Sequence, residues 1–285
     1  MSHTFSRRHF LAVSATATAG AMLVSPGFAT QDAPADDPYA GLPMGMQSYS
    51  LRNFDVATAI RQIQGLKLKC VEFYGAHFPL DASDEQISAM KKTLADAGIK
   101  ITAHGVNDFT SDHERNRRVF EFAKKVGFRN ITANPRPDSF DSLERLVDEY
   151  DIRVCIHNHG PGALYDKLPD MTAAFRNRDE RIGACVDTGH VLRSSEDPVK
   201  WVRELGGRVY ALHIKDVAEQ QARTHDVVIG RGHLNVDGLF TALKEIEFPK
   251  DGSMSIEYES NPDNPIADIE QCLAVARESI GKVYA

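Results

Sequence analysis

Polar or ionisable residues recur along this chain at the ends of short apolar runs. The series is Gln47, Glu72, His104, Asn134, His157, Asp187, His213 and Glu257. The last four offer imidazole nitrogens and carboxylate oxygens, which are ligands for a divalent cation. This donor set suits manganese, with zinc, cobalt, iron or magnesium as alternatives. The sequence therefore predicts a divalent metal ion bound among the histidines and carboxylates of this series.

From Leu42 onward, β-like runs alternate with helix-like runs. Eight strands are predicted, at Met44–Ser50, Lys69–Phe73, Lys100–His104, Asn130–Ala133, Arg153–His157, Ile182–Asp187, Val209–His213 and Ser253–Tyr258. Amphipathic helices are predicted between them, including Asp84–Ala97 with Ser83 as N-cap, His113–Val126, Ser142–Tyr150 and Ile266–Ile280. Eight β/α alternations in one domain predict a closed (β/α)8 TIM barrel. The alternative, an open doubly wound sheet, usually has a glycine-rich turn after its first strand, and none occurs here.

The alternation of side chains along a strand predicts which residues face the barrel interior. In the sixth predicted strand Cys185 and Asp187 share a face, and in the seventh Ala211 and His213 share one. Each inner face is small or polar and ends in an ionisable residue at the C-terminal end of its strand. In TIM barrels that rim is where active sites are built.

Four short phrases and the eight-strand layout resemble one family. The phrases are His157-Asn158-His159, Asp187-Thr188-Gly189-His190, His213-Ile214-Lys215-Asp216 and Ile256-Glu257-Tyr258-Glu259. They resemble the sugar phosphate isomerase/epimerase family, the xylose-isomerase-like barrels that include inosose dehydratase and endonuclease IV. The opening Gln47-Ser48-Tyr49-Ser50-Leu51-Arg52 is similar to the first strand of exported members. The resemblance covers the whole chain after its N-terminal segment.

In that family, residues ending strands five to eight hold one metal ion, typically Glu, Asp, His and Glu. Asp187, His213 and Glu257 match in type, whereas His157 stands where the epimerases have Glu. In the epimerases two ligating glutamates move protons on opposite faces of the substrate, and only Glu257 remains of that pair. A histidine at this position also resembles the dehydratase branch, so lyase chemistry stands beside isomerisation.

The resemblance implies a metal-dependent sugar isomerase or epimerase that acts through an enediolate on a keto or aldo sugar. The metal polarises the carbonyl, and Glu257, His157 or His159 is the general base. Loss of a β-substituent instead would make the enzyme a dehydratase or lyase acting on an inosose or a 3-keto-glycoside. Two other classes are a non-catalytic sugar-binding barrel and an endonuclease IV-like phosphodiesterase, which would use three metals.

Residues beside the predicted ligands are candidates for substrate binding. His190 matches a family position that contacts substrate hydroxyls, and is otherwise a loop histidine. Lys215 helps to hold substrate or forms an ion pair with Asp216 at the rim. The substrate-binding candidates are Glu72, His104, His190, Lys215 and Glu259.

Structural roles are open for some of these residues. Asp187 could cap the following helix, and His213 could be a core histidine. Glu72 and His104 could hydrogen-bond to each other instead of lining a pocket. Glu257 is harder to explain structurally, because a buried carboxylate is costly without a partner.

The first 29 residues have the order of an export signal. Ser6-Arg7-Arg8-His9-Phe10-Leu11 precedes a mildly apolar run, and Ser25-Pro26-Gly27-Phe28-Ala29 places small residues before a cut after Ala29. The paired arginines resemble a twin-arginine signal, which predicts a periplasmic or otherwise exported protein. Residues 30–41 are predicted to be a linker and 42–285 the barrel. A membrane anchor or a disordered tail is the alternative for the signal.

Composition narrows the predicted partners. The formal net charge is −7 over 285 residues, which disfavours nucleic acid. No internal segment is long and apolar enough to span a bilayer, so no stable membrane span is predicted after cleavage. Cys70, Cys155, Cys185 and Cys272 are interpreted as free, buried thiols rather than disulfides. The predicted partner is a small carbohydrate or polyol, and a homo-oligomer is compatible with these features.

Overall fold

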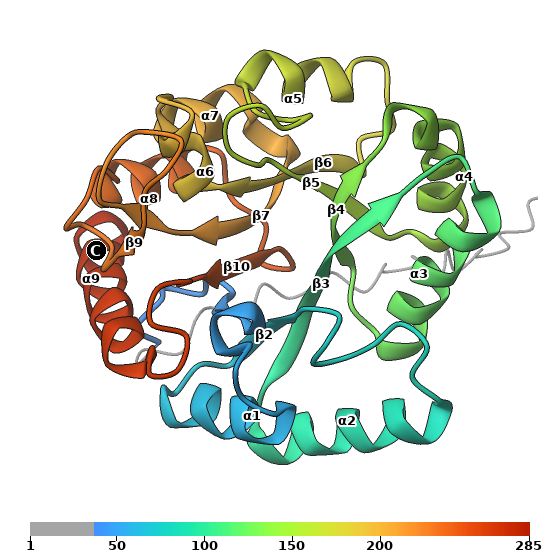
Figure 1. The fold of residues 1–285 in the computed structure, drawn as a ribbon, viewed down its shortest axis with the longest axis horizontal. Coiled ribbons are helices and arrows are strands. Elements are labelled where there is room, and N and C mark those ends of the chain that lie inside the picture. The colour runs from blue at the N-terminus through green and yellow to red at the C-terminus, as the bar shows by residue number, and fades with distance from the viewer. Residues whose placement is uncertain (1–36) are drawn as a thin grey trace, which may run out of the picture. The chain divides into compact units, whose positions relative to one another are not determined.

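The structure is a computed structural model that describes residues 37–285 (Figure 1). Eight parallel strands close into a barrel in the order β1-β10-β7-β6-β5-β4-β3-β2, so the predicted TIM barrel is confirmed. The strands are β1 (Met44–Gln47), β2 (Cys70–Phe73), β3 (Lys100–Phe109), β4 (Asn130–Pro135), β5 (Arg153–His157), β6 (Ile182–Asp187), β7 (Val209–Ile214) and β10 (Ser253–Ile256). A small antiparallel pair, β8 (Asp216–Val217) and β9 (Asp226–Val227), follows β7.

Helices form the outer layer around the strands (Figure 1). They are α1 (Val56–Gly65), α2 (Asp84–Ala97), α3 (His113–Val126), α4 (Phe140–Tyr150), α5 (Leu168–Phe175), α6 (Thr188–Arg193), α7 (Pro198–Leu205), α8 (Val236–Glu245) and α9 (Ile266–Tyr284). Short 3-10 helices are η1 (Ser48–Leu51), η2 (Pro137–Ser139) and η3 (Gly206–Arg208). The predicted bounds of α2 and α3 are confirmed. For α2, Ser83 and Gln86 form a capping box at the start, and Gly98 adopts a left-handed conformation after the end.

Several strand ends differ from the prediction. β1 ends at Gln47 because the Gln47 side chain accepts a hydrogen bond from the backbone N–H of Tyr49 and the chain turns into η1. β10 ends at Ile256, so Glu257 is the first residue after the strand. β3 is longer than predicted and pairs with β4 as far as Phe109 and Pro135.

One register shift in β3 changes which side chains face inward. Val71 pairs with Ile101, but Glu72 pairs with Ala103, so Thr102 is an extra residue in β3. A bulge of this kind reverses the alternation of faces beyond it. His104 pairs with Phe73, which lies on the outer face of β2. This shift removes His104 from the series of inward residues that the sequence predicted.

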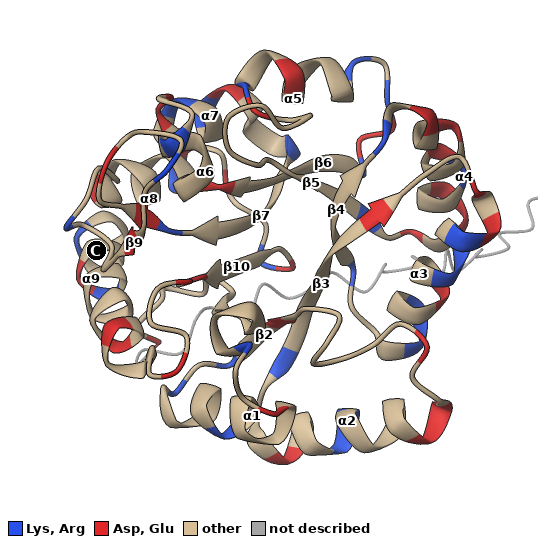
Figure 2. Cartoon of the chain, viewed as in Figure 1, with Lys and Arg blue, Asp and Glu red and all other residues tan. Residues whose placement is uncertain are grey.

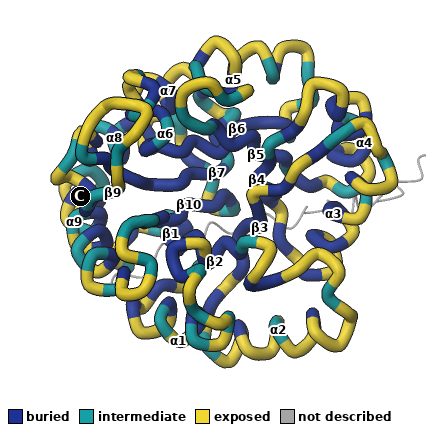
Figure 3. The backbone as a smooth tube through the Cα atoms, viewed as in Figure 1, coloured by how far each residue is buried: buried dark blue, intermediate teal, exposed yellow. Residues whose placement is uncertain are grey.

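Side chains pack in two compartments. The main core lies between the strands and the helices, and Figure 3 shows the barrel strands as largely buried. A separate small cluster of Cys155, Cys185 and Ala211 lies apart from that core, as the predicted inner face requires. The Thr102 and Ser253 hydroxyls meet at 2.9 Å. All four cysteines are free; Cys155, Cys185 and Cys272 are buried as predicted, whereas Cys70 is partly exposed.

Both charge signs occur on the outer helices (Figure 2). Residues 37–41, assigned to the linker from the sequence, belong to the folded unit, because Tyr39 is buried and its hydroxyl accepts a hydrogen bond from Arg277 at 3.3 Å. The predicted signal and residues 30–36 lie outside the described residues. Within residues 37–285, no helix combines the length and the apolarity that crossing a bilayer requires.

Candidate metal centre and substrate cavity

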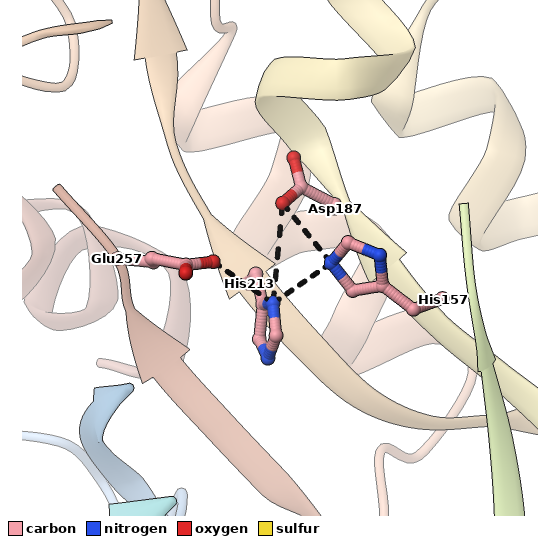
Figure 4. Close-up of side chains that lie close together, drawn as sticks. All are labelled: His157, Asp187, His213 and Glu257. Carbon is pink, nitrogen blue, oxygen red and sulfur yellow. Dashed lines mark hydrogen bonds and ion pairs between the residues drawn. The ribbon is translucent and has the colours of Figure 1, made fainter. Parts of the chain in front are cut away.

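The four predicted metal ligands meet at the C-terminal rim of the barrel (Figure 4). His157 ends β5, Asp187 ends β6, His213 lies near the end of β7 and Glu257 follows β10. One ligand atom from each lies within 4.8 Å of the other three, and all four residues are buried. His213 Nδ1 lies 3.0 Å from both His157 Nε2 and Glu257 Oε2. We call this group the metal quartet.

The chemistry of the quartet fits a divalent metal ion. Asp187 Oδ2 and Glu257 Oε2 are buried, and neither accepts a hydrogen bond among the described residues. Lys215 Nζ lies 3.1 and 3.0 Å from these two oxygens, without the geometry of a hydrogen bond. Buried carboxylate oxygens that accept no hydrogen bond are costly, and a metal ion among the four donor atoms would bind both oxygens directly, in addition to the charge of Lys215. Two imidazoles and two carboxylates are a normal donor set for manganese, zinc or iron.

Asp187 combines two roles that the sequence offered as alternatives. Its Oδ1 accepts a hydrogen bond of 2.8 Å from the backbone N–H of His190, which caps α6. Its Oδ2 faces His157 Nε2 at 3.3 Å. The amide of Asn158 brackets the Asp187 backbone, donating to its carbonyl at 3.0 Å and accepting from its N–H at 2.8 Å. Capping therefore orients the carboxylate rather than competing with metal binding.

Glu72 lies behind His213 instead of lining the cavity. Its Oε2 accepts a hydrogen bond of 2.9 Å from His213 Nε2, and its Oε1 accepts one from the Thr132 hydroxyl. A carboxylate on the outer nitrogen of a ligating histidine fixes the ring and its tautomer. The predicted substrate contact of Glu72 is thus replaced by support of a ligand, because the residue points across the barrel interior.

The protonation of the quartet follows from its burial and charges. Burial lowers the pKa of His157, which favours the neutral form that a metal ligand needs. Burial alone would also lower the pKa of His213, but Cys185, Glu72 and Glu257 raise it well above its usual value. For Glu257, burial raises the pKa, yet Lys215 and His213 outweigh it and hold the pKa below its usual value.

His104 does not reach the cavity. Its Nε2 contacts the Phe78 carbonyl at 2.9 Å, and its Nδ1 lies 3.3 Å from the Asn107 amide. The ring stacks on Phe128 and meets the edge of Phe122. The register shift in β3 explains this position, and the structure assigns His104 to packing outside the barrel rather than to substrate or to Glu72.

A cavity of about 420 Å³ opens beside the quartet. Its lining comprises Gln47, Tyr49, Tyr74, Gly75, Gly105, Val106, His157, His159, His190, Arg193, Lys215, Glu257 and Glu259. The predicted residues His159, His190, Lys215 and Glu259 are therefore brought together beside the metal quartet. Of the two quartet carboxylates, Glu257 is part of the lining and Asp187 is not.

Lys215 is a buried cation in the lining of this cavity. Its ammonium lies 2.5 Å from Glu259 Oε1 as well as near the two quartet carboxylates. Burial favours the neutral amine, but Asp187, Glu257 and Glu259 together raise the pKa of Lys215 well above its usual value. Lys215 is therefore charged at neutral pH, and its partner is Glu259 rather than the rim residue Asp216.

Asp216 has a structural task instead. Its carboxylate accepts hydrogen bonds from the backbone N–H groups of Gly230, Gly232, His233 and Leu234, at 2.7 to 2.9 Å. The glycine-bearing loop after β9 is thus wrapped around an internal anion. These backbone N–H groups of the loop are therefore already hydrogen-bonded to Asp216.

His159 and His190 form a neutral imidazole wall. Burial and the neighbouring His157 lower the pKa of His159 to about 4, and burial lowers that of His190 to about 3. Arg193 Nη1 lies 3.0 Å from His190 Nδ1, and Arg193 is itself held by the Ala222 carbonyl at 2.8 Å. Because guanidinium can only donate, His190 must carry its proton on Nε2, the nitrogen nearer Asp187.

Sequence reasoning missed Arg193, Tyr49 and Tyr74 as cavity residues. Arg193 lies three residues after His190, a spacing that places both on one face of α6. That spacing was the available signal. Tyr49 and Tyr74 follow β1 and β2, at the same rim as the ligands.

Residues 60–278 match the family of xylose isomerase-like TIM barrels. The match covers most of the chain, so the protein belongs to this family. With the geometry above, it is a barrel of the xylose isomerase-like class with a buried metal site.

Individual relatives are distant. The chain is 24% identical over 236 residues to inosose dehydratase 1 of a Bacillus cereus strain, covering 76% of this chain and 73% of that protein. An uncharacterized protein of Parabacteroides distasonis superposes with a TM-score of 0.66 at 29% identity, over 84% of this chain and 99% of the other. D-psicose 3-epimerase of Clostridium cellulolyticum superposes with a TM-score of 0.69 at 16% identity, over 84% and 99%.

Proposed function

We propose that this protein is a metal-dependent carbon–oxygen lyase that removes water or an alcohol from a carbonyl-bearing sugar or polyol. One observation carries the proposal. Both carboxylates that line the cavity, Glu257 and Glu259, come from the segment after β10, and the facing side contributes the neutral imidazoles of His159 and His190. A single carboxylate side suits elimination better than epimerisation, which needs bases on both faces of a carbon.

The quartet would hold the metal, which supplies Lewis acidity to the carbonyl oxygen beside the reacting carbon. Glu257 is the quartet carboxylate that lines the cavity, so it is placed to accept the proton from that carbon. The electron pair of the C–H bond then forms a carbon–carbon double bond as the C–O bond to the β-oxygen breaks with its pair on oxygen, and the same carboxyl group delivers the proton to the departing oxygen. One carboxylate is therefore enough to remove the proton and to return it to the leaving oxygen.

Other cavity residues orient the substrate. The Lys215 ammonium is positioned to donate to a substrate oxygen close to Glu257. His190 presents its Nε2–H, because Arg193 occupies the other nitrogen. The relation to inosose dehydratases supports this assignment, since the name of those proteins describes loss of water from a cyclic polyol ketone.

Isomerisation or epimerisation of a keto or aldo sugar is the second candidate. The observation that favours it is the placement of His159 after β5 and Glu257 after β10, with β6 and β7 between them in the barrel. A neutral imidazole in that position can accept a proton on the face opposite Glu257.

Incubation in heavy water separates these outcomes. Metal-loaded protein is mixed with ketoses, aldoses, inososes and 3-keto-glucosides, and NMR follows deuterium beside the carbonyl and the products formed. A lyase yields an unsaturated or dehydrated product, whereas an epimerase yields a deuterated stereoisomer. The Glu257→Gln variant should lose both reactions. Absence of exchange with every compound would contradict proton removal beside a carbonyl.

We also propose that the enzyme meets its substrate outside the cytoplasm. This rests on the sequence of residues 1–29 alone, with Arg7 and Arg8 ahead of an apolar run and a small-residue cleavage pattern. Cell fractionation tests it: replacement of Arg7 and Arg8 by Lys should retain the protein in the cytoplasm. Equal distribution of both forms would contradict export by this route.

A further inference from the structure

The cavity is larger and less uniform than one sugar ring requires. Its volume of about 420 Å³ falls in the range of ~300–1,000 Å³ typical of pockets for drug-sized ligands. Lys215 and two members of the metal quartet, His157 and Glu257, supply polar contacts to the cavity from the β5, β7 and β10 side. Tyr49, Tyr74 and Val106 line it from the β1, β2 and β3 side. We call these three residues the outer wall.

The outer wall exposes apolar surface at the cavity mouth. Tyr49 is 37% exposed and Val106 41%. They are two of only four large apolar side chains with this much exposure among residues 37–285. Scattered exposed apolar residues are normal, but a group that lines a cavity marks a surface for a ligand.

The tyrosines of the outer wall are held in place. The Arg52 guanidinium covers one face of Tyr49 at 4.7 Å, and Arg52 donates to the Glu259 carbonyl at 2.7 Å. The rings of Tyr49 and Tyr74 meet edge to face with centroids 5.4 Å apart. His77 packs against the Tyr74 ring at 4.5 Å. Rings fixed in this way lose little freedom when a ligand stacks on them.

A glycine keeps the space beside the tyrosines open. A Cβ atom at Gly75 would meet no other atom within 4 Å, so the position is empty although it lines the cavity. Gly105 differs, because a Cβ there would collide with Thr132. The absence of a side chain at Gly75 is therefore unexplained by packing and enlarges the mouth.

We infer that the outer wall is a second subsite that binds a ring attached to the reacting sugar, so the substrate is a glycoside rather than a free monosaccharide. The flat C–H face of a sugar or an aryl ring suits tyrosine faces. The reacting sugar then occupies the polar side beside Glu257 and Lys215. This inference rests on the proposed function only for the identity of the reacting end.

Binding measurements test the subsite separately from catalysis. Calorimetry with the metal-loaded protein compares glucose, galactose and mannose with their 4-nitrophenyl β-glycosides. Each glycoside that binds should do so about tenfold or more tightly than its parent sugar, the gain expected when two tyrosines contact one ring. Equal affinity within every pair, or no binding by any compound, would overturn the subsite.

Substitutions test which residues produce the gain in glycoside affinity. Tyr49→Ala and Gly75→Leu should remove it while leaving the affinity for the free sugar and the metal content unchanged, and Tyr49→Phe should retain it because the ring is kept. Leu164→Ala is the matched control, since Leu164 is exposed but does not line the cavity. Equal weakening of sugar and glycoside by both Tyr49→Ala and Gly75→Leu would place these residues at the reacting sugar and overturn the inference. A retained glycoside gain without deuterium exchange would refute the proposed reaction and leave the subsite intact.

Discussion

The two halves of the barrel mouth contribute different chemistry. The half formed by β5, β6, β7 and β10 carries the metal quartet and Lys215. The side formed by β1, β2 and β3 contributes Gln47, two tyrosines, two glycines and Val106 to the same cavity, and β4 contributes none of its lining. Under the proposed function, the reaction and the binding of the attached ring would use different sides of one mouth, so we expect substitutions to separate them. Glu72 is the exception: it belongs to β2, but its side chain accepts a hydrogen bond from His213 inside the barrel.

The largest effect is expected from removing a quartet ligand. Asp187→Ala should abolish stoichiometric metal binding and lower activity by more than about 100-fold, beyond the loss typical for residues that only support ligands. Elemental analysis of purified protein provides the measurement. Asp108→Ala is the control, because Asp108 is an exposed carboxylate near the end of β3. Metal loss in the control, or retention in Asp187→Ala, would contradict the division of the mouth.

Glu72 tests whether the β1–β3 half is independent of the metal. Glu72→Gln removes the charge behind His213 and should weaken metal affinity by about 10- to 100-fold, the usual cost of losing such a partner. Glu259→Gln should leave affinity nearly unchanged, since Glu259 binds Lys215 instead of belonging to the quartet. Competition with a chelator of known affinity measures both. An unchanged Glu72→Gln would mean that the quartet needs no support from β2.

Metal binding should strengthen as pH rises. The raised pKa of His213 keeps a proton on the metal-free site, and that proton must leave before Nδ1 can bind a cation. Below this pKa, affinity should fall by up to about tenfold per pH unit. Titration calorimetry in two buffers of different ionisation enthalpy should detect proton release near neutral pH, and less release for Glu72→Gln. Proton-neutral binding would contradict the assignment of a charged His213.

The smallest effect concerns the imidazole wall. Arg193→Lys cannot reproduce both the contact with His190 and those with Ala222, so His190 should populate both tautomers. Activity should fall by about three- to tenfold, the value of one hydrogen bond, with metal content unchanged. Nitrogen NMR of the histidines reports the tautomer directly. A single Nε2–H tautomer in the variant would show that Arg193 does not position His190.

Many of the residues at the barrel mouth could be predicted from the sequence, because the alternation of side chains along a strand is a local property. Asp187 and His213 were predicted to face inward from the alternation within their own strands, and the structure places them together. The prediction that His104 faces inward was wrong because the extra residue Thr102 in β3 reverses the alternation of faces, and nothing in the sequence marks that bulge. The prediction that Glu72 contacts substrate was wrong for another reason: its hydrogen-bond partner His213 lies 141 residues away in the sequence.

The sequence by itself determined the barrel, the identity of the four candidate ligands and the departure at His157, since these depend on pattern and residue identity. Tertiary structure decided which nitrogen of His213 faces the quartet, that Lys215 pairs with Glu259, and that Tyr49 and Tyr74 form an outer wall. The physical reason is the distance along the chain over which each effect acts. Periodicity acts over a few residues, whereas hydrogen bonds, buried charge and cavity shape arise only when strands distant in sequence close into a ring.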